Sequence, residues 1–262
     1  MILIEVEKFS VVILAAGKGK RMKNPDMSKV MALLAGKPLI EHVLEQVQNL
    51  KSEKTIIIVG HQKESVIDFV NSLKIKNISY VEQNEQLGTG HAVAQAESEF
   101  IGYEGNILIL SGDVPLLQSR TLNNFIDNHT DYFNDLSVLS TFTDNPTGYG
   151  RIVRDKNKKF LKIVEEKDAT PEEKLIKEIN SGVYILRCEY LFDALKEVSN
   201  KNSQGEYYLT DIIDILRKQG LQVGAFAGAK FEELQGINSP DDLERAEKYY
   251  SVIPANAGIS IV

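Results

Sequence analysis

Residues that could hold phosphate groups lie near the start of the chain. An apolar run over residues 11–16 ends at two glycines, Gly17 and Gly19, that are one residue apart. Glycine lets backbone N–H groups approach an anion closely. Cations follow within a few positions, namely Lys18, Lys20, Arg21 and, after a polar loop, Lys29. The spacing predicts a strand that leads into a phosphate-binding loop.

This loop differs from two widespread phosphate-binding loops. It has no closing Gly-Lys-Ser/Thr, so it is not a Walker A loop. Met22 stands where the dinucleotide-binding fingerprint has its third glycine, and Pro25 prevents an immediate long helix. A nicotinamide-dependent oxidoreductase is therefore disfavoured. An ordinary strand-to-helix turn with surface lysines stays open on this stretch alone.

A single carboxylate follows a second apolar strand. Residues 106–110 predict a buried strand, and Asp113 comes three positions after it. Ligands of open α/β sheets bind at the carboxyl ends of the strands, so we expect Asp113 on the same edge as the glycine loop. There it could hold a magnesium ion beside bound phosphates. The competing interpretation is a turn aspartate that caps a helix beginning near Ser119.

A polar stretch follows the strand predicted over residues 78–81. It contains Gln83 and then Gly88, Thr89 and Gly90, after which a helix is expected from His91 to Glu99. The N-terminus of that helix would face the same edge of the sheet and favour an anion there. A polar loop with Thr89 as a helix cap explains the same residues without a ligand.

Strands and helices are expected to alternate through the first half of the chain. Apolar runs predict strands over residues 54–59 and 136–142, and stripes with helical spacing predict helices over 39–50 and 66–73. This alternation is typical of an α/β fold with a mainly parallel sheet flanked by helices. After Asp135 the pattern changes, because residues 148–165 alternate around a charged turn and predict a β-hairpin.

The chain is expected to divide into a core and an insert. Residues 1–9 would be a short leader or include an extra edge strand, 10–250 the folded domain, and 251–262 a loose tail. Within the domain, about 145–235 would form a β-rich insert over the ligand edge of a core made by residues 10–144. Residues 236–250 would add a closing helix, with Ser239 as its N-cap and Pro240 in its first turn.

The composition of the 262 residues narrows the class of protein. With 43% hydrophobic and 26% charged residues, the chain resembles an ordinary globular protein. A net charge of −7 argues against a general nucleic-acid binder. The single cysteine, Cys188, excludes an intrachain disulfide and suits a reducing compartment. No run is long enough for a membrane span and no signal peptide is recognisable, so a cytoplasmic enzyme without a membrane partner is expected.

Several motifs, in this order, resemble the sugar-phosphate nucleotidylyltransferases. Among these the chain looks like the uridylyltransferase domain of the bacterial bifunctional UDP-N-acetylglucosamine pyrophosphorylase/glucosamine-1-phosphate acetyltransferases. The resemblance covers about residues 10–250, and it implies a Rossmann-like nucleotidyltransferase fold with a β-rich sugar-binding subdomain. The motifs that carry it lie at residues 14–22, 85–92, 112–116, 146–152, 178–182 and 204–212.

The family reaction joins a nucleoside triphosphate to a sugar 1-phosphate. For this chain the resemblance implies UTP and N-acetylglucosamine 1-phosphate as substrates, and UDP-N-acetylglucosamine and pyrophosphate as products. The sugar phosphate would attack the α-phosphorus of UTP in line, assisted by Mg²⁺. Because phosphoryl transfer leaves little covalent chemistry to the protein, positioning and charge neutralisation are expected to carry the rate.

The resemblance also implies a role for individual residues. The catalytic residues would be Arg21, which neutralises the triphosphate and the departing pyrophosphate, and Lys29, which lies against the reacting phosphates. The nucleotide would be held by Ala16, Gly17, Lys18, Gln83, Gly88 and Thr89, with the last three reading uracil. The sugar would be held by Gly150, Glu165 and Asn180. Asp113 and Asn238 would bind Mg²⁺, since one carboxylate and one amide oxygen suffice beside substrate phosphates.

Two departures from the family pattern bear on these expectations. Ser28 stands where a proline usually precedes the lysine, and the preceding loop is about one residue longer, so Lys29 is expected to be held less rigidly. The chain also stops about where the bifunctional enzymes continue into a left-handed β-helix. We therefore expect no acetyltransferase activity, and a monomer or small homo-oligomer rather than the family trimer.

Two alternatives stay open. The chain could be a nucleotidylyltransferase for another base or another sugar 1-phosphate, such as a thymidylyl, cytidylyl or glucose 1-phosphate enzyme. It could also be a non-catalytic sensor of nucleotide sugars, although Arg21, Lys29, Asp113 and Asn238 are all retained.

Overall fold

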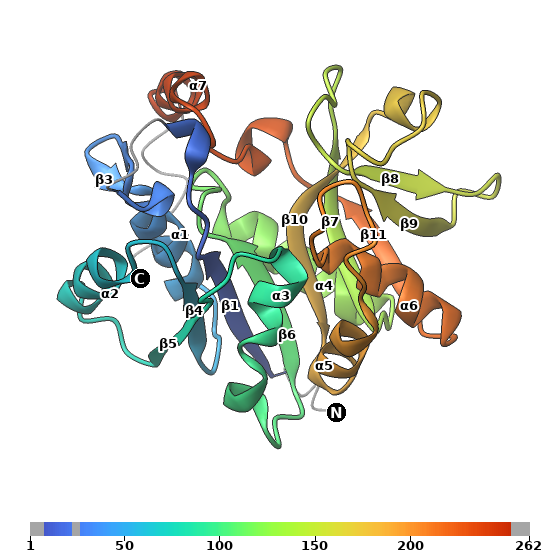
Figure 1. Ribbon diagram of the computed structural model, residues 1–262, viewed down its shortest axis with the longest axis horizontal. Helices are drawn as coiled ribbons and strands as arrows, with labels where there is room; N and C mark the ends of the chain where they lie inside the picture. Colours follow the sequence, from blue (N-terminus) through green and yellow to red (C-terminus); the bar gives the residue numbers. More distant parts are fainter. Residues whose placement is uncertain (1–7, 23–26, 253–262) are drawn as a thin grey trace, which may run out of the picture.

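A computed structural model describes residues 8–22 and 27–252, and over these residues the chain forms a nine-stranded sheet (Figure 1). Its main path runs β11-β7-β10-β6-β1-β4-β5, with β8 joined to β10 and β9 to β8. The strands are β1 (Phe9–Ala15), β4 (Thr55–Val59), β5 (Ile78–Glu82), β6 (Asn106–Ser111), β7 (Leu136–Phe142), β8 (Arg151–Arg154), β9 (Phe160–Val164), β10 (Glu178–Arg187) and β11 (Val223–Ala227). Residues 1–7 of the leader expected over 1–9, and residues 253–262 of the tail expected over 251–262, lie outside the described residues. Phe9, the last residue of the expected leader, already belongs to β1.

Parallel pairing dominates the part of the sheet nearest the glycine loop. β1 pairs in parallel with β4 and with β6, and β4 pairs in parallel with β5. β10 runs antiparallel between β6 and β7, and β11 is parallel to β7. The expectation of a mainly parallel α/β sheet is confirmed, and parallel neighbours end at one common edge.

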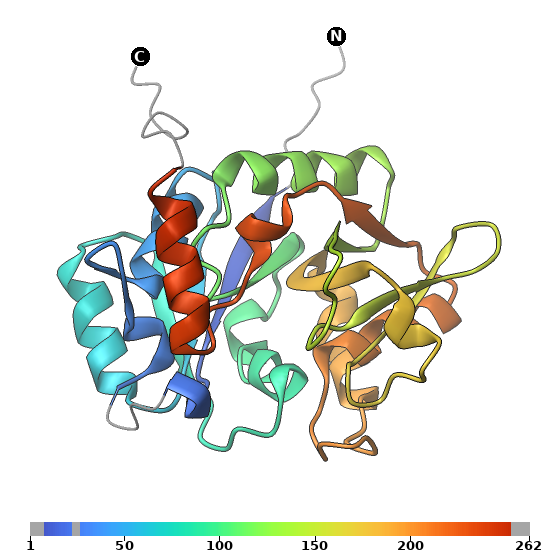
Figure 2. The same cartoon turned by 90° about the horizontal axis from the view of Figure 1, so that it is seen from above.

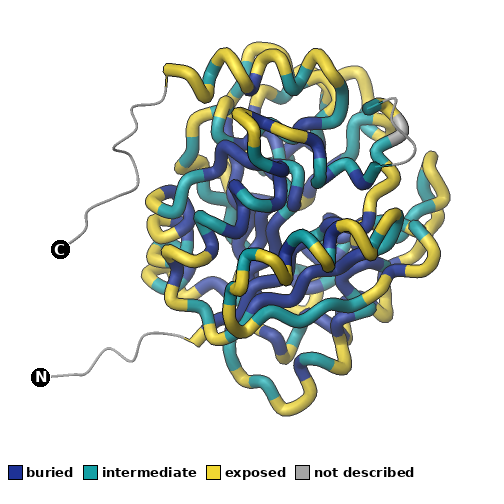
Figure 3. Tube along the Cα trace, turned by 90° about the vertical axis from the view of Figure 1, so that its left-hand side faces the viewer, coloured by how far each residue is buried: buried dark blue, intermediate teal, exposed yellow. Residues whose placement is uncertain are grey.

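Helices cover both faces of the sheet, because successive side chains of a strand point to opposite sides. In β1, Val11 and Ile13 pack with α1, α2 and α4, whereas Val12 packs with α3, α5 and α6. Figure 2 shows α4 and α3 on opposite sides, and in Figure 3 the strands form a buried band between exposed segments. The helices are α1 (Leu39–Gln48), α2 (Lys63–Ser72), α3 (Thr89–Ala94), α4 (Ser119–Asp131), α5 (Cys188–Glu197), α6 (Ile212–Lys218) and α7 (Pro240–Tyr250).

The helix expected from His91 to Glu99 is wrong in its bounds. The α-helix begins earlier and ends at Ala94, and a 3₁₀ turn over Glu97–Phe100 continues the path. The tighter turn is visible in i→i+3 bonds, with the N–H of Ala96 3.0 Å from the carbonyl oxygen of Val93. Such turns are frequent at helix ends.

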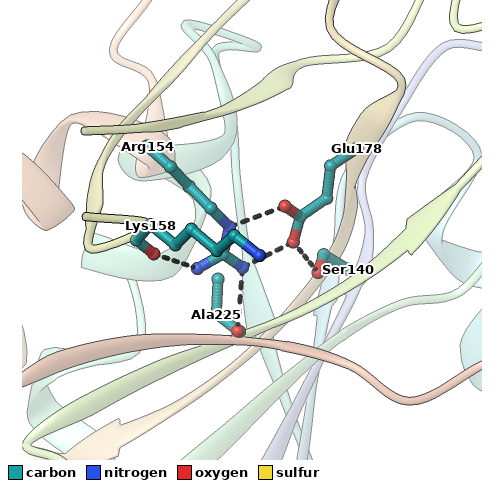
Figure 4. A network of polar contacts seen from close by, with 5 residues as sticks. All are labelled: Ser140, Arg154, Lys158, Glu178 and Ala225. Carbon is teal, nitrogen blue, oxygen red and sulfur yellow. Dashed lines mark hydrogen bonds and ion pairs between the residues drawn. The ribbon is translucent and has the colours of Figure 1, made fainter. Parts of the chain in front are cut away.

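The expected hairpin after residue 148 is confirmed as β8 paired antiparallel with β9. Arg154 ties this hairpin to the sheet (Figure 4): Nε and Nη2 lie 2.7 and 2.6 Å from the two carboxylate oxygens of Glu178. Nη2 also donates to the carbonyl oxygen of Ala225, and Nη1 to that of Lys158. Glu178 is buried and accepts a further bond from Ser140 Oγ at 2.7 Å. An ion pair whose acidic member is buried therefore holds the hairpin to the sheet.

Helix α7 closes the other end of the molecule. Ser239 caps it, accepting from the N–H of Asp242, and Pro240 is its first residue, as expected. Ala246 of α7 packs with Leu34 and Leu39 from the short β2-β3 (Leu33–Leu34, Lys37–Pro38) and α1 region. This docking brings the segment before α7 back onto the N-terminal half of the chain (Figure 2).

β10 and β11 come from the segment expected to be an insert, yet both lie in the central sheet, with β10 between β6 and β7. The division at residue 145 therefore does not coincide with the edge of a sheet, and its functional meaning stays a prediction. Within residues 8–22 and 27–252, every helix is too short or too polar to cross a bilayer.

Candidate active site

The loops that carry Gly17, Gln83 and Asp113 follow the carboxyl ends of the parallel strands β1, β5 and β6. The N–H of Gly112, after β6, donates to the carbonyl oxygen of Leu14 in β1 at 2.9 Å. The N–H of Gln83, after β5, donates to that of Val59 in β4 at 2.8 Å. These bonds extend the parallel pairing beyond the strand ends, so the segment after β6 lies beside the end of β1, and the segment after β5 lies beside the end of β4.

Lys29, Asp113 and Asn238 meet in one polar cluster at this edge. The ammonium group of Lys29 forms an ion pair with Asp113 Oδ2, and it donates to Asn238 Oδ1 at 2.9 Å. The side chains of Lys29 and Asp113 are 16% and 14% exposed. The structure thus unites the predicted catalytic lysine with both predicted metal ligands, from three distant parts of the chain.

Backbone contacts hold the cluster from both sides. Gly19 has a φ of +58°, and a Cβ atom there would lie 2.7 Å from Cβ of Lys29. The glycine loop therefore packs directly against the lysine. Ser28, in place of the family proline, is buried and has an extended backbone with φ −61°, close to the value a proline imposes. The N–H of Ile237 donates to the carbonyl oxygen of Asp113 at 2.8 Å, which fixes the approach of Asn238.

Among the described residues, two cavities meet at Ser111 and Asp113, which line both. The smaller measures about 320 Å³, and the larger about 600 Å³. Of the predicted residues, the smaller cavity is lined by Ala16, Gly17, Lys29, Gln83, Gly88, Thr89 and Asp113. The larger is lined by Arg21, Asp113, Gly150, Glu165, Asn180 and Asn238. The predicted nucleotide and sugar residues are thus separated into two adjoining spaces.

Two predicted residues take positions that differ from their expected grouping. Arg21, expected beside the triphosphate, is exposed and lines the larger cavity. Lys18, expected to bind the nucleotide, is exposed and is not among the described residues that line either cavity. Both follow Gly17 closely in the chain, yet neither lines the smaller cavity that Gly17 lines.

The wall of the smaller cavity joins two distant segments. The N–H of Tyr207 donates to the carbonyl oxygen of Leu87, and the N–H of Gly90 donates to that of Tyr207, both at 2.8 Å. Thr89 Oγ1 accepts from the N–H of Leu209 at 3.1 Å. At Gly88, with φ +114°, a Cβ would lie 2.5 Å from the carbonyl oxygen of Tyr207. Glycine is required here because the two backbones touch.

The larger cavity is lined by a half-buried acid, Glu165, and by an amide with fixed orientation, Asn180. Asn180 Nδ2 donates to the hydroxyl of Tyr184 at 2.7 Å, and its Oδ1 accepts from the N–H of Gly182 at 3.0 Å. Burial raises the pKa of Glu165, and the hydrogen bond from Thr210 opposes this shift. A Cβ at Gly150 would contact both carboxylate oxygens of Glu165 at 3.4 Å. The space above Glu165 is therefore kept open by a missing side chain.

Further lining residues were not predicted individually. Ser111, Tyr149 and Glu206 adjoin or lie within the motifs that carry the family resemblance, so a signal for them existed. Gln86 is a member of the polar stretch after β5. Arg245 lines the larger cavity from α7 and had no local sequence signal.

The donor set suits a magnesium ion that is shared with substrate. Mg²⁺ is commonly held by one or two carboxylates together with substrate phosphates, rather than by an all-protein cage. Asp113 and Asn238 supply one carboxylate and one amide oxygen that already converge on a cation, the Lys29 ammonium. No cluster of three or more metal-binding His, Cys, Asp or Glu side chains occurs among residues 8–22 and 27–252. The described residues therefore fit a magnesium site whose remaining ligands come from substrate phosphates.

The family model described as nucleotidyl transferase matches residues 10–236. The chain is 48% identical over 243 residues to the bifunctional protein GlmU of Caldanaerobacter subterraneus subsp. tengcongensis, covering 93% of this chain and 52% of that protein. It is 46% identical over 240 residues to the bifunctional protein GlmU of Clostridioides difficile, covering 92% and 51%. The chain thus spans about half the length of the curated relatives it matches.

Solved structures share the fold at lower identity. A UDP-glucose pyrophosphorylase complexed with UDP-glucose matches with a TM-score of 0.77 and 21% identity, over 93% of this chain and 98% of that one. A putative glucose-1-phosphate thymidylyltransferase from Bacillus anthracis matches with a TM-score of 0.73 and 21% identity, over 94% and 96%. These likenesses establish the architecture.

Proposed function

The chain belongs to the nucleotidyl transferase family, and from this premise we propose that it transfers a uridylyl group from UTP to N-acetylglucosamine 1-phosphate. The products would be UDP-N-acetylglucosamine and pyrophosphate. The observation that carries the proposal is the meeting of two cavities at Asp113, with Lys29 and Asn238 bonded beside it. This arrangement suits a reaction between two phosphorylated substrates, one in each space.

The reaction proceeds by a single in-line displacement. A phosphate oxygen of the sugar 1-phosphate attacks the α-phosphorus of UTP, and a new P–O bond forms. The bond between the α-phosphorus and its bridging oxygen to the β-phosphorus breaks, and both electrons leave with pyrophosphate. No covalent enzyme intermediate is needed, so the protein contributes orientation and charge stabilisation.

The smaller cavity would hold the nucleotide. Ala16 and Gly17 offer backbone at the end of β1, and Gln83, Gly88 and Thr89 surround the far wall. Lys29 lines this cavity and reaches Asp113 at the junction, so its ammonium is suited to neutralise charge at the reacting phosphorus. Arg21 lines the second cavity and would neutralise phosphate charge from there.

The larger cavity would hold the sugar phosphate. Glu165 and Asn180 present acceptors and donors for sugar hydroxyl and amide groups, and Gly150 leaves the space that a ring requires. A magnesium ion held by Asp113 and Asn238 would supply positive charge to the phosphates when it is bound. We include in the proposal a cytoplasmic location and a monomer or small homo-oligomer.

Pyrophosphate release, measured with each nucleoside triphosphate in combination with each sugar 1-phosphate, tests the proposal. We expect the largest kcat/KM for UTP with N-acetylglucosamine 1-phosphate, and no turnover when the divalent metal is removed. Equal or greater turnover with dTTP and glucose 1-phosphate would contradict the assignment of base and sugar. Binding of UDP-N-acetylglucosamine without any metal-dependent turnover would identify a sensor instead.

A further inference from the structure

The amide of Gln83 has one orientation that satisfies its neighbours. Gln83 is 4% exposed and lines the smaller cavity. Its Nε2 atom lies 3.1 Å from the carbonyl oxygen of Gly88 and 3.1 Å from His91 Nδ1. A carbonyl oxygen can only accept, so the amide must turn its NH₂ group toward Gly88. The oxygen Oε1 is thereby directed away from this carbonyl.

The second N–H of the same amide group determines the state of His91. It points at Nδ1, which must therefore be an unprotonated acceptor, with the ring proton on Nε2. A proton on Nδ1 would set donor against donor. Turning the amide to relieve that clash would set Oε1 against the carbonyl oxygen of Gly88. His91 and Gly88 thus hold Gln83 jointly, one from each side.

Gln95 lies on the opposite side of the imidazole and is the more adaptable partner. Its Nε2 lies 3.2 Å from His91 Nε2 and donates to the His91 carbonyl oxygen at 3.0 Å. Turning the Gln95 amide to accept from the Nε2–H of His91 gives up the bond to the His91 carbonyl oxygen, but Gln95 is half-buried, so water can replace that bond. Gln83 is enclosed, so a bond that its amide lost by turning would not be replaced in this way. The arrangement in which His91 Nδ1 accepts from the Gln83 amide is therefore the one that must be kept.

We propose that His91 is a positioning residue for base selection. By holding the Gln83 amide with its NH₂ group engaged, His91 leaves a hydrogen-bond acceptor, Oε1, for the base. An acceptor at this point suits uracil or thymine, whose ring N3 carries a hydrogen. It opposes cytosine, whose N3 carries a lone pair. The inference rests on the proposed function, because it requires the base to occupy the smaller cavity.

The chemistry gives this selection its strength. Two acceptors that face each other in an enclosed site are both left without a hydrogen bond, which opposes binding of the wrong base. Sites built around a substrate hydrogen bond discriminate far more strongly than apolar pockets do. Without the acceptor of His91, only the Gly88 bond of these two would oppose rotation of the amide, so the amide would offer NH₂ to cytosine more readily and the discrimination would weaken. His91 is not among the described residues that line the cavity, so it acts through Gln83.

Three variants of the full chain test this role. His91→Leu removes the acceptor with little change in size, whereas His91→Asn keeps an acceptor, Oδ1, at the same branch position as Nδ1. Gln95→Leu is the matched control on the other side of the ring. For each protein, the dissociation constants of UTP and CTP are measured with Mg²⁺ and without sugar phosphate, and kcat/KM is measured for both nucleotides.

We expect His91→Leu to reduce the preference for UTP over CTP at least tenfold, with kcat for saturating UTP changed by less than about threefold, since the loss falls on binding. His91→Asn and Gln95→Leu should keep the preference within about threefold of the wild type. Both nucleotides are measured with the same preparation of each variant. A partial loss of folded protein lowers kcat/KM for UTP and CTP by the same factor, so their ratio stays unchanged.

An unchanged ratio in His91→Leu would overturn the proposal, as would an equal loss in Gln95→Leu. These outcomes differ from failure of the proposed function, which would appear in the wild type as an absence of UTP binding or of preference for UTP.

Discussion

The two cavities are built by different means. The smaller is lined largely by residues that follow the parallel strands β1, β5 and β6, such as Ala16, Gln83 and Asp113. The larger also takes residues from the hairpin and from the segment around α7, including Glu165 and Arg245. The smaller cavity therefore depends mainly on the parallel part of the sheet. The larger depends in addition on the hairpin, which is held by ion pairs with a buried member.

The supports of the larger cavity illustrate this dependence. The guanidinium of Arg151 is buried in the hairpin and pairs with Glu166 at 2.6 Å. Glu178, two residues before Asn180 in β10, pairs with Arg154. Burying one member of such a pair alone is costly. We therefore expect mutations around the larger cavity to affect stability and sugar binding, and those around the smaller to affect nucleotide chemistry.

The largest effect is expected for Arg154→Met, which breaks the ion pair that ties the hairpin to β10. Glu178 would remain buried with Ser140 as its remaining partner in that network, and the free energy of unfolding should fall by about 3–5 kcal/mol. Urea unfolding measures this change. The matched control is Lys177→Met, whose exposed ion pair with Asp144 is screened by water, so this substitution should leave the free energy of unfolding nearly unchanged. If the two substitutions lowered the free energy of unfolding equally, the Arg154–Glu178 pair would not be the special support of the hairpin that we infer.

Lys29→Met tests the junction of the two cavities. Loss of the Lys29 ammonium group should lower kcat by roughly 10²–10³-fold if this group stabilises charge that develops in the transition state. Steady-state pyrophosphate release measures the change. Lys63→Met, which removes an exposed pair with Glu82 outside the site, should leave kcat within about twofold. An effect of Lys29→Met confined to KM would show that the lysine binds ground and transition states equally.

Asp113→Asn should raise the magnesium concentration required for half-maximal activity by about tenfold, because a neutral amide binds the cation less strongly than a carboxylate. Titration of the initial rate with MgCl₂ provides the measurement. Asp241→Asn, at the exposed start of α7, is the control. A superimposable magnesium titration for Asp113→Asn would remove this residue from the proposed metal site.

The smallest effect is expected for Glu165→Gln, which tests whether the larger cavity holds the sugar phosphate. Since burial raises the pKa of this carboxyl, the isosteric amide should be tolerated in the fold. KM for the sugar phosphate should rise about five- to tenfold through the loss of a charge-assisted hydrogen bond, while KM for UTP stays within twofold. A rise in KM for UTP alone would reverse the assignment of the two spaces.

Local sequence patterns were sufficient for the parallel sheet and for its ligand edge. The apolar runs ending at Gly17 and Gly60 and the strand before Asp113 define strands whose polar successors had to meet, as the structure confirms. The hairpin was likewise visible as alternation around a charged turn. Helix α5, in contrast, was not predicted, although Leu191 and Leu195 lie on its buried side.

The contacts between side chains within the site could not be predicted from local sequence patterns. Family resemblance suggested Lys29, Asp113 and Asn238 individually, but their direct bonds join positions 84 and 209 residues apart. Spacing along the chain carries no information at such range. The burial of Arg151 was equally hidden, because a charged residue in a hairpin is expected to face solvent unless a partner such as Glu166 encloses it.

The bond between Lys29 and Asn238 has a consequence for biosynthesis. A ribosome that adds about 5–20 residues per second needs roughly 10–40 s to deliver Asn238 after Lys29, since 209 positions separate them. During this interval the strands that form the smaller cavity can already pair, while the polar cluster still lacks its third member. The proposed activity therefore requires a residue that is synthesised well after the elements proposed to bind the nucleotide.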